Sequence, residues 1–409
     1  MTAAISDLAQ ATPASRDRYV DFLRAASILV VVFGHWMIAV LSWDHGVIRA
    51  TSAIGHTPWL WTATWIGQVM PVFFFVGGYA NLVAYESARR RGDSVLTFIR
   101  SRVRRLLVPS VALLAVWAVV QFVLHMTNTG TPTGPRFGGF VLLRGVRPPG
   151  QTVPFGPLWF LAVYLLVVCI SPLTVALHRR LRWWIPAIFV VGTVVVDLVG
   201  FAGDHHRIRY LNVIFVLLLP HQLGHFYGDG SAVKWPRRTL WAMVLVGLGG
   251  LLALTNAGPM RLVGDRRFDW FPGIGHYPLS LLGTDVEKVS NAYPPTMCFM
   301  LVGIWLIGAV LLLRPRLTAW LQRSGPWKAT LTGNAWIMTL FLWHMTAYLI
   351  AILLLWPLGF GHETEPTARW WLERPLWIAV AGAILAGLVA VFGRFETQRR
   401  RSAVATPTK

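Results

Sequence analysis

The chain has 409 residues, of which 55% are hydrophobic and only 13% are charged, and its mean hydropathy is +0.55. A soluble protein of this length needs far more charge to cover its surface, so the composition excludes an ordinary globular enzyme. The net charge of +20 does not indicate a nucleic-acid partner, because the basic residues form short clusters between apolar runs and no basic domain. These apolar runs predict a polytopic membrane protein.

We predict an all-α fold, a polytopic transmembrane helical bundle. Its ten spans are expected at about 20–42, 65–86, 106–125, 156–177, 184–202, 209–227, 238–256, 294–313, 335–356 and 372–392. The segments on the side of the two termini carry 23 Lys or Arg residues, and the opposite loops carry 10. The positive-inside rule therefore predicts a multi-pass protein of the plasma membrane with both termini in the cytoplasm.

This pattern predicts one membrane domain between two short tails. A cytoplasmic tail is expected at 1–18, the ten-span domain at 19–393, and a basic cytoplasmic tail at 394–409. The domain includes a long outer loop at 257–293, whose aromatic and hydrogen-bonding residues suit a ring-shaped polar acceptor such as a sugar. The alternative interpretation of this loop is a lid that only caps the bundle.

The first span holds two residues that are costly in lipid, Arg24 and His35. They are eleven positions apart, which places them about 20° from one face and roughly 16 Å apart along a helix. A cation at the membrane edge and an imidazole at depth on one stripe suggest a cleft that opens to one side. Asp21, three residues before Arg24, lies on the same face and can orient its guanidinium group.

The next two spans are joined by the loop richest in arginine. Arg102 and Arg105 share one helical face at the start of the third span, and guanidinium groups bind phosphates in bidentate fashion. This pair is consistent either with an anion-binding site or with an anchor that only binds lipid headgroups and fixes the topology. Arg100 and Arg104 share another face of the helix. In the second span, Gly77 and Gly78 indicate either close helix packing or a break that exposes backbone to a cavity.

Polar residues in the later spans are candidates for cavity or acceptor contacts: Trp159, Asp197 and His344. Trp159 is also explained as an interfacial anchor, and Asp197 as the partner of a nearby cation. His221 and His225 have a spacing that can place two imidazoles on one metal ion. No third ligand follows in the sequence, so no metal site is predicted.

Several segments resemble the acyltransferase-3 family of integral-membrane O-acyltransferases. YVDFLRAASILVVVFGHW resembles the family's opening Arg-x10-His helix, with Arg24 and His35 in register, and FIRSRVRRLLVP resembles its Arg-x-x-Arg loop. VMPVFFFVGGYA, GPLWFLAVYL and LFLWHM resemble further family segments in the expected order. Gly77 departs from the pattern where the family often has Ser, and Tyr164 stands near where many members have Glu. No hydrolase-like domain is appended, so the membrane module alone is expected.

The resemblance implies transfer of an acyl group, often acetyl, from acyl-CoA to a hydroxyl group, here weakly favoured as that of a cell-envelope saccharide or glycolipid. It implies that Arg24, Arg102 and Arg105 bind the donor phosphates and that His35 acts as the general base. An acyl-histidine intermediate is the alternative mechanism. Acyl-CoA would be a co-substrate, with no permanently bound cofactor, and membrane lipids would surround the protein. Oligomeric state is left open, with a homodimer allowed.

Two other classes of protein fit parts of the same pattern. A transporter or flippase for an envelope precursor or lipid would also carry charges within its spans and a long outer loop. A structural subunit of an envelope-assembly complex is the third interpretation. The feature that discriminates the enzyme is the combination of a phosphate-suited arginine cluster with one deep histidine on the same path.

Overall fold

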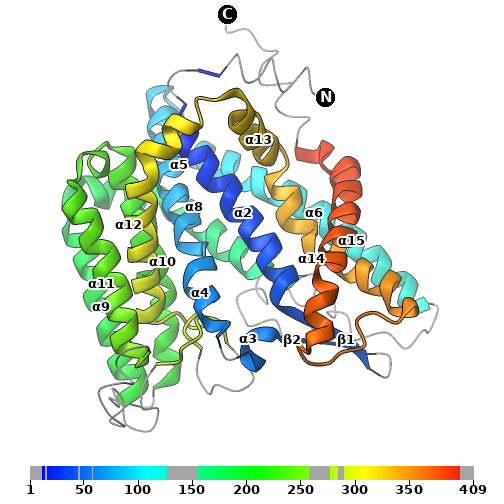
Figure 1. The fold of residues 1–409 in the computed structure, drawn as a ribbon. Helices are drawn as coiled ribbons and strands as arrows, with labels where there is room; N and C mark the ends of the chain where they lie inside the picture. The colour runs from blue at the N-terminus through cyan, green and yellow to red at the C-terminus, as the bar shows by residue number, and fades with distance from the viewer. Residues whose placement is uncertain are drawn as a thin grey trace, which may run out of the picture.

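The computed structural model describes residues 12–13, 16–44, 47–57, 59–126, 155–203, 205–257, 277–283 and 290–396. The first half of the bundle consists of α2 (Arg18–Ile38), β1 (Ala39–Asp44), β2 (Val47–Ser52), α3 (Ala53–His56), α4 (Trp61–Gly67), α5 (Met70–Arg90), α6 (Val95–Met126), α8 (Leu158–Leu181) and α9 (Trp184–Ala202). The second half consists of η2 (His206–Leu211), α10 (Asn212–Gly228), η3 (Ala232–Lys234), α11 (Arg237–Thr255), α12 (Met297–Trp320), α13 (Ser324–Ala335), α14 (Ile337–Leu355), η5 (Trp356–Leu358) and α15 (Ala368–Phe392). Figure 1 shows the long helices side by side in one bundle.

Nine stretches in the described part of the chain are long and apolar enough to cross a membrane, which confirms a multi-pass helical protein. The predicted span at 209–227 is the one without such a stretch. Its residues form η2 and α10, and α10 is only 17 residues long. This helix is short because it lies inside the bundle, where most of its side chains are buried against other helices.

Although short, α10 runs from one end of the bundle to the other. At its start Asn212 donates to Asp197 near the end of α9, and just past its end Asp229 contacts His178 near the end of α8. The chain turns at opposite ends of the bundle after α8 and after α9 (Figure 1). Counting α10, ten helices of the described bundle run between its two ends.

The described beginning and end of the chain lie at one end of the bundle, as an even number of crossings requires. Arg24 near the start of α2 contacts Asn334 on α13, and Glu396 accepts hydrogen bonds from the backbone of Met338 and Thr339 at the start of α14. Arginine residues also gather at this end, at the start of α6 and at the ends of α5 and α8. We call it the basic end; the hairpin end is opposite.

The first span is shorter than predicted. α2 ends at Ile38, and the chain continues into an antiparallel hairpin in which Ala39 pairs with Ser52 and Asp44 with Val47. A short apolar run such as Ala39–Val40–Leu41 is compatible with either a helix or a strand, so periodicity could not place this boundary. Most of the predicted loop at 257–293 lies outside the described residues; 277–283 and 290–293 belong to the described part.

Close helix packing, and not a break, explains the glycine pair of the second span. α5 is a continuous helix with Pro71 in its first turn. A Cβ atom on Gly78 would lie 1.9 Å from the carbonyl oxygen of His221, and one on Gly224 would lie 2.0 Å from that of Phe75. Each helix therefore presents a glycine to the backbone of the other, and α5 and α10 form the tightly packed centre of the bundle.

Candidate functional site

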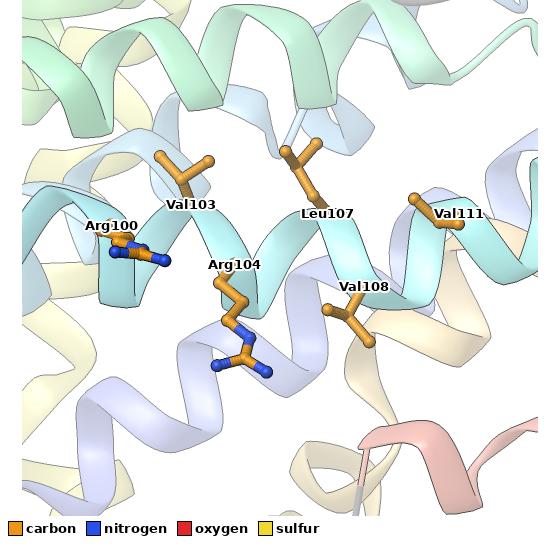
Figure 2. A pocket seen from close by; sticks show the side chains of 6 residues that line it. All are labelled: Arg100, Val103, Arg104, Leu107, Val108 and Val111. Carbon is orange, nitrogen blue, oxygen red and sulfur yellow. The ribbon is translucent and has the colours of Figure 1, made fainter.

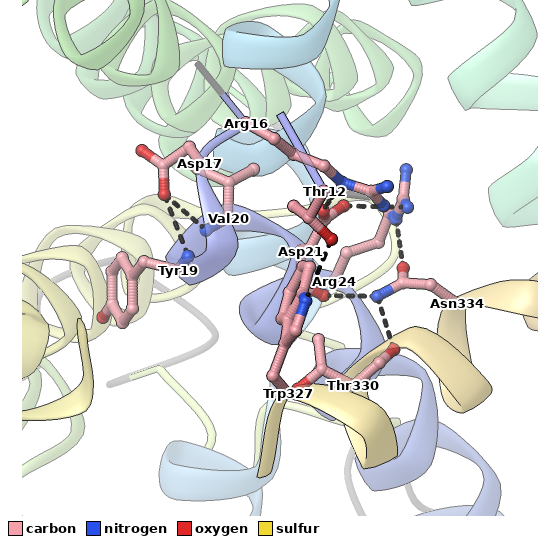
Figure 3. A network of polar contacts seen from close by, with 10 residues as sticks. All are labelled: Thr12, Arg16, Asp17, Tyr19, Val20, Asp21, Arg24, Trp327, Thr330 and Asn334. Atoms are coloured by element: carbon pink, nitrogen blue, oxygen red, sulfur yellow. Dashed lines mark hydrogen bonds and ion pairs between the residues drawn. The ribbon is translucent and has the colours of Figure 1, made fainter. Parts of the chain in front are cut away.

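Helix α2 carries the two residues on which the predicted site rests. The helix begins at Asp17, whose carboxylate accepts hydrogen bonds from the backbone of Tyr19 and Val20. About two turns later Arg24 donates from Nη2 to Asp21 (3.1 Å) and from Nε to the side-chain oxygen of Asn334 (2.6 Å). Figure 3 shows the guanidinium group between these two partners. The predicted orienting role of Asp21 is consistent with this geometry.

The segment from α13 to α14 pairs with α2 and the start of β1 at a nearly constant offset in sequence. Arg24 contacts Asn334, Trp36 donates from its indole to the carbonyl of His344, and Tyr348 donates to the carbonyl of Ala39. The partners are separated by 308 to 310 positions in each case. The segment from α13 to α14 thus lies parallel to α2 and supports it at both ends of the predicted path.

The predicted deep imidazoles, His35 and His344, contact each other. Nε2 of His344 lies 3.0 Å from Nδ1 of His35, and the two rings stack with centroids 5.1 Å apart. Nδ1 of His344 lies 2.6 Å from the carbonyl oxygen of Phe341. A carbonyl can only accept, which assigns the proton of His344 to Nδ1 and leaves its Nε2 as an acceptor.

This arrangement fixes the tautomer of both rings. Because Nε2 of His344 accepts, Nδ1 of His35 must donate, and the lone pair of neutral His35 is therefore on Nε2. His344 is 0% exposed, whereas His35 is partly exposed. The accessible ring can thus act as a base, and the buried ring holds it in place and can share the charge of its protonated form.

The predicted phosphate-binding arginines lie near Arg24. Arg102 donates from Nη2 to the carbonyl of Ala80 on α5 (2.9 Å), and Arg105 follows one turn later on α6. The guanidinium groups of Arg24, Arg102 and Arg105 all lie within electrostatic range of Tyr164 on α8. Three cations from two helices therefore act electrostatically on one phenol of α8.

A row of aromatic rings joins this cation cluster to the imidazole pair. Tyr164 stacks on Phe160 (6.0 Å between centroids), and Phe160 meets Phe341 edge to face at 5.6 Å. Phe341 lies 6.1 Å from His344, which stacks on His35. The wall between the two ends of the site is therefore apolar, and it suits an uncharged, flexible arm better than a hydrated ion.

The other arginine pair on α6 faces away from this cluster. A groove of about 380 Å³ follows one stripe of the helix and has arginines at one end and apolar side chains along the rest (Figure 2). Its lining residues are Arg100, Val103, Arg104, Leu107, Val108 and Val111. Such a stripe suits lipid, with the guanidinium groups near the headgroups. It holds none of the predicted site residues.

Two further predicted site residues, Asp197 and Trp159, contact other parts of the bundle. Asp197, 2% exposed, accepts from Asn212 and Tyr277 and from the backbone of Met297. Burial and the Asp197 carboxylate raise the pKa of Tyr277, so its phenol stays a proton donor. Asp197 therefore ties α9 to α10, to the segment 277–283 and to α12. Trp159 is half-buried at the start of α8, where its ring contacts the edge of Phe160.

The two histidines with metal-ligand spacing have hydrogen-bond partners within the bundle. Nε2 of His221 lies 3.3 Å from the side chain of Asn81. Nε2 of His225 lies 3.1 Å from Thr174, and its Nδ1 lies 3.0 Å from the carbonyl of Gly78. These three ring contacts thus serve the packing of α5, α8 and α10.

Comparison with known families identifies the class of this protein. An acyltransferase domain, the acyltransferase-3 type, matches residues 17–393, which is nearly the whole chain. The chain belongs to the acyltransferase-3 family. No curated protein and no solved structure matches it. In this acyltransferase the matched region includes every residue of the cation cluster, the aromatic row and the imidazole pair. Family membership also implies an acyl donor and an acceptor as its two substrates.

Sequence reasoning missed one residue of the acyltransferase site and the role of another. Asn334, 1% exposed, holds Arg24 but falls in a stretch that was predicted as a loop between spans. A single asparagine in such a loop carries no signal. Tyr164 was noted only as a departure from the family pattern, although all three arginines act on it electrostatically. The replacement of the usual Glu by Tyr164 was the feature of the sequence that could have drawn attention to this residue.

Proposed function

We propose that this acyltransferase moves an acyl group, most simply acetyl, from acyl-CoA to a hydroxyl group of a cell-envelope saccharide or glycolipid. The observation that carries the proposal is that Arg24, one member of the cation cluster, and the imidazole of His35 lie on one helix. Eleven residues of α2 separate Arg24 from His35, which is roughly 16 Å along the axis. A phosphate-bearing donor with an extended thioester arm bridges such a distance.

The donor is proposed to bind at the basic end, with its phosphates on Arg24, Arg102 and Arg105. Guanidinium groups suit phosphates because their fork of N–H donors matches two oxygens at once. The clustering of arginine at this end supports a cytoplasmic location for it, together with both termini, in the plasma membrane. The arm of the donor would then follow the aromatic row towards His35.

His35 is proposed to act as the general base. Its Nε2 takes the proton of the acceptor hydroxyl while the hydroxyl oxygen attacks the thioester carbonyl carbon. The tetrahedral species collapses, the carbon–sulfur bond breaks, and the thiolate of CoA takes up a proton from the imidazolium. The products are the ester and CoA thiol. Throughout, His344 accepts the Nδ1–H of His35 and so stabilises the transient positive charge.

The acceptor is proposed to approach from the hairpin end. Trp159 at the start of α8, beside the aromatic row, offers an aromatic face of the kind on which a sugar ring packs. The predicted loop at 257–293 would contribute further contacts, and Asp197 fixes the described part of it to the bundle. In this proposal these residues contribute to the acceptor site, whereas Asp21 and Arg24 contribute to the donor site.

The proposal is tested with radiolabelled acetyl-CoA and the purified protein in detergent, with and without envelope extract. Wild type should release or transfer label, and His35→Ala should bind the donor but turn it over at least 100-fold more slowly. Arg102→Ala with Arg105→Ala should raise the donor KM at least tenfold.

Arg100→Ala with Arg104→Ala is the matched control, since it removes the same charge from another face of α6. Equal effects of the two arginine pairs would refute the phosphate site. If the wild-type protein neither binds nor turns over the donor, the result would instead favour the interpretation as a transporter.

A further inference from the structure

Tyr164 is held in a fixed position by a glycine and a cage of phenylalanine rings. A Cβ atom on Gly77 would lie 2.9 Å from Cε2 of Tyr164 and 3.4 Å from its hydroxyl oxygen. The phenol therefore lies directly over the α5 backbone, in space that any side chain at position 77 would fill. Phe160 stacks on the ring, and Phe73 and Phe74 meet it edge to face. The packing thus determines where the hydroxyl points.

The hydroxyl lies in a positively charged environment. Arg24, Arg102 and Arg105 all act on it electrostatically. Asp21 is the one carboxylate that the described residues place against these arginines, and it is already hydrogen-bonded to Arg16 and Arg24. The positive charge of the cluster is therefore in excess, and an anion of more than one charge suits it best.

The Tyr164 hydroxyl also has no hydrogen-bond partner among the residues that the structure describes. Tyr164 is half-buried, and its hydroxyl is not among the fully buried polar atoms that lack a partner, so the oxygen is accessible to a ligand. An accessible donor beside three cations suits an anionic oxygen. A neutral phenol donates to such an oxygen and leaves the guanidinium charges intact. A carboxylate at the same place would cancel one of them and would repel the anion.

We propose that Tyr164 is a further donor-binding residue, whose hydroxyl binds a phosphate oxygen beside the three arginines and so adapts the site to a polyanionic donor. Gly77 is its positioning partner, because only a residue without a side chain leaves room for the phenol. The inference rests on the proposed function, since the donor there is a phosphorylated nucleotide. It adds a hydrogen bond from α8 to contacts that otherwise come from α2 and α6.

The test is the binding of CoA, which carries the phosphates but no acyl group, to the full-length protein in detergent by titration calorimetry. Tyr164→Phe keeps the ring and its packing and should raise the Kd about tenfold or more, because a hydrogen bond to a charged group is lost. Tyr164→Glu should raise it further. It should also reduce the preference for CoA over its 3′-dephospho form. Tyr210→Phe, at an exposed tyrosine, is the matched control.

A second set of variants tests the role of the glycine. Gly77→Ser should displace the phenol and weaken CoA binding as much as Tyr164→Phe does, and the double variant should be no weaker than either single one. Gly34→Ala, where an added Cβ meets nothing within 4 Å, should leave the Kd unchanged. Additive effects of the Gly77 and Tyr164 changes would overturn the positioning role.

The outcomes separate this inference from the proposed function. If Arg102→Ala with Arg105→Ala abolishes CoA binding but Tyr164→Phe binds CoA like wild type, the Tyr164 inference is wrong and the donor site stands. If wild type itself does not bind CoA, both are overturned. Weaker CoA binding by Tyr164→Phe but not by Tyr210→Phe supports both the Tyr164 inference and the proposed function.

Discussion

The contact between His35 and His344 gives the sharpest prediction about catalysis. His344→Phe keeps an aromatic ring of similar size against His35 but removes the acceptor for its Nδ1–H. His35 can then lose its orientation and its preferred tautomer, and its protonated form loses a partner. His344→Gln is the conservative variant, since its side-chain oxygen can occupy roughly the place of Nε2. We expect His344→Phe to lower kcat and His344→Gln to restore part of it.

The size of the effect follows from the hydrogen bond of 3.0 Å between the two rings. In the transition state this bond has a charged donor, and such bonds contribute about 1.5–3 kcal/mol. With about 1.4 kcal/mol for each factor of ten in rate, kcat should fall roughly 10- to 150-fold. The KM of the acyl donor should change little, because the proposed phosphate site lies towards the other end of α2.

The assay is steady-state transfer of radiolabelled acetyl groups, with the unfolding temperature in detergent as a check on folding. A structural role alone would lower the unfolding temperature of both variants and would not make Gln more active than Phe. If folded His344→Phe has the kcat of wild type, the imidazole pair has no part in proton transfer. If it raises the donor KM instead, His344 acts in binding.

Two further predictions concern the packing that supports the site. Gly78→Ala should destabilise the protein by roughly 1–3 kcal/mol or more, because its Cβ would lie 1.9 Å from the carbonyl oxygen of His221. Gly249→Ala, with nothing within 4 Å, is the control, and an unchanged thermal unfolding curve for Gly78→Ala would contradict the close packing of α5 and α10. Asp197→Asn should lower stability by about 1–3 kcal/mol, since its amide would place a donor against existing donors. Its transfer kinetics should stay near those of wild type, and a selective rise in acceptor KM would show that Asp197 binds substrate.

The class of fold was predictable from the sequence because the membrane makes hydropathy and charge strongly informative. The apolar runs located the spans, and the surplus of arginine identified one end of the bundle. The predictions of helix boundaries and lengths were less accurate where strand pairing or helix packing, and not hydropathy, determines the structure. The run at Ala39–Val40–Leu41 forms a strand, which hydropathy cannot distinguish from a helix. α10 is shorter than a span because neighbouring helices, and not lipid, cover it.

The site was predictable only in those parts that one helix determines. Arg24 and His35 share a stripe because eleven residues are close to three turns, so spacing alone related them. Nothing in the sequence could bring His344 to His35, because 309 positions separate them. The same limit applies to Asn334 and Arg24, and to Tyr164 beside the arginines of α6. These contacts depend on how helices pack, which local patterns do not record.

The register between α2 and the segment from α13 to α14 gives the long-range contacts a common cause. Asn334 holds Arg24, His344 holds His35, and Tyr348 bonds the backbone at Ala39, always at an offset close to 309. Two parallel segments with one offset keep the distance between the cation cluster and the base constant. The helix that carries the site therefore does not need to be rigid alone, because its neighbour fixes it at each end. In the proposed reaction, a donor whose arm matches that distance would be selected by the pair of helices together, and not by either segment alone.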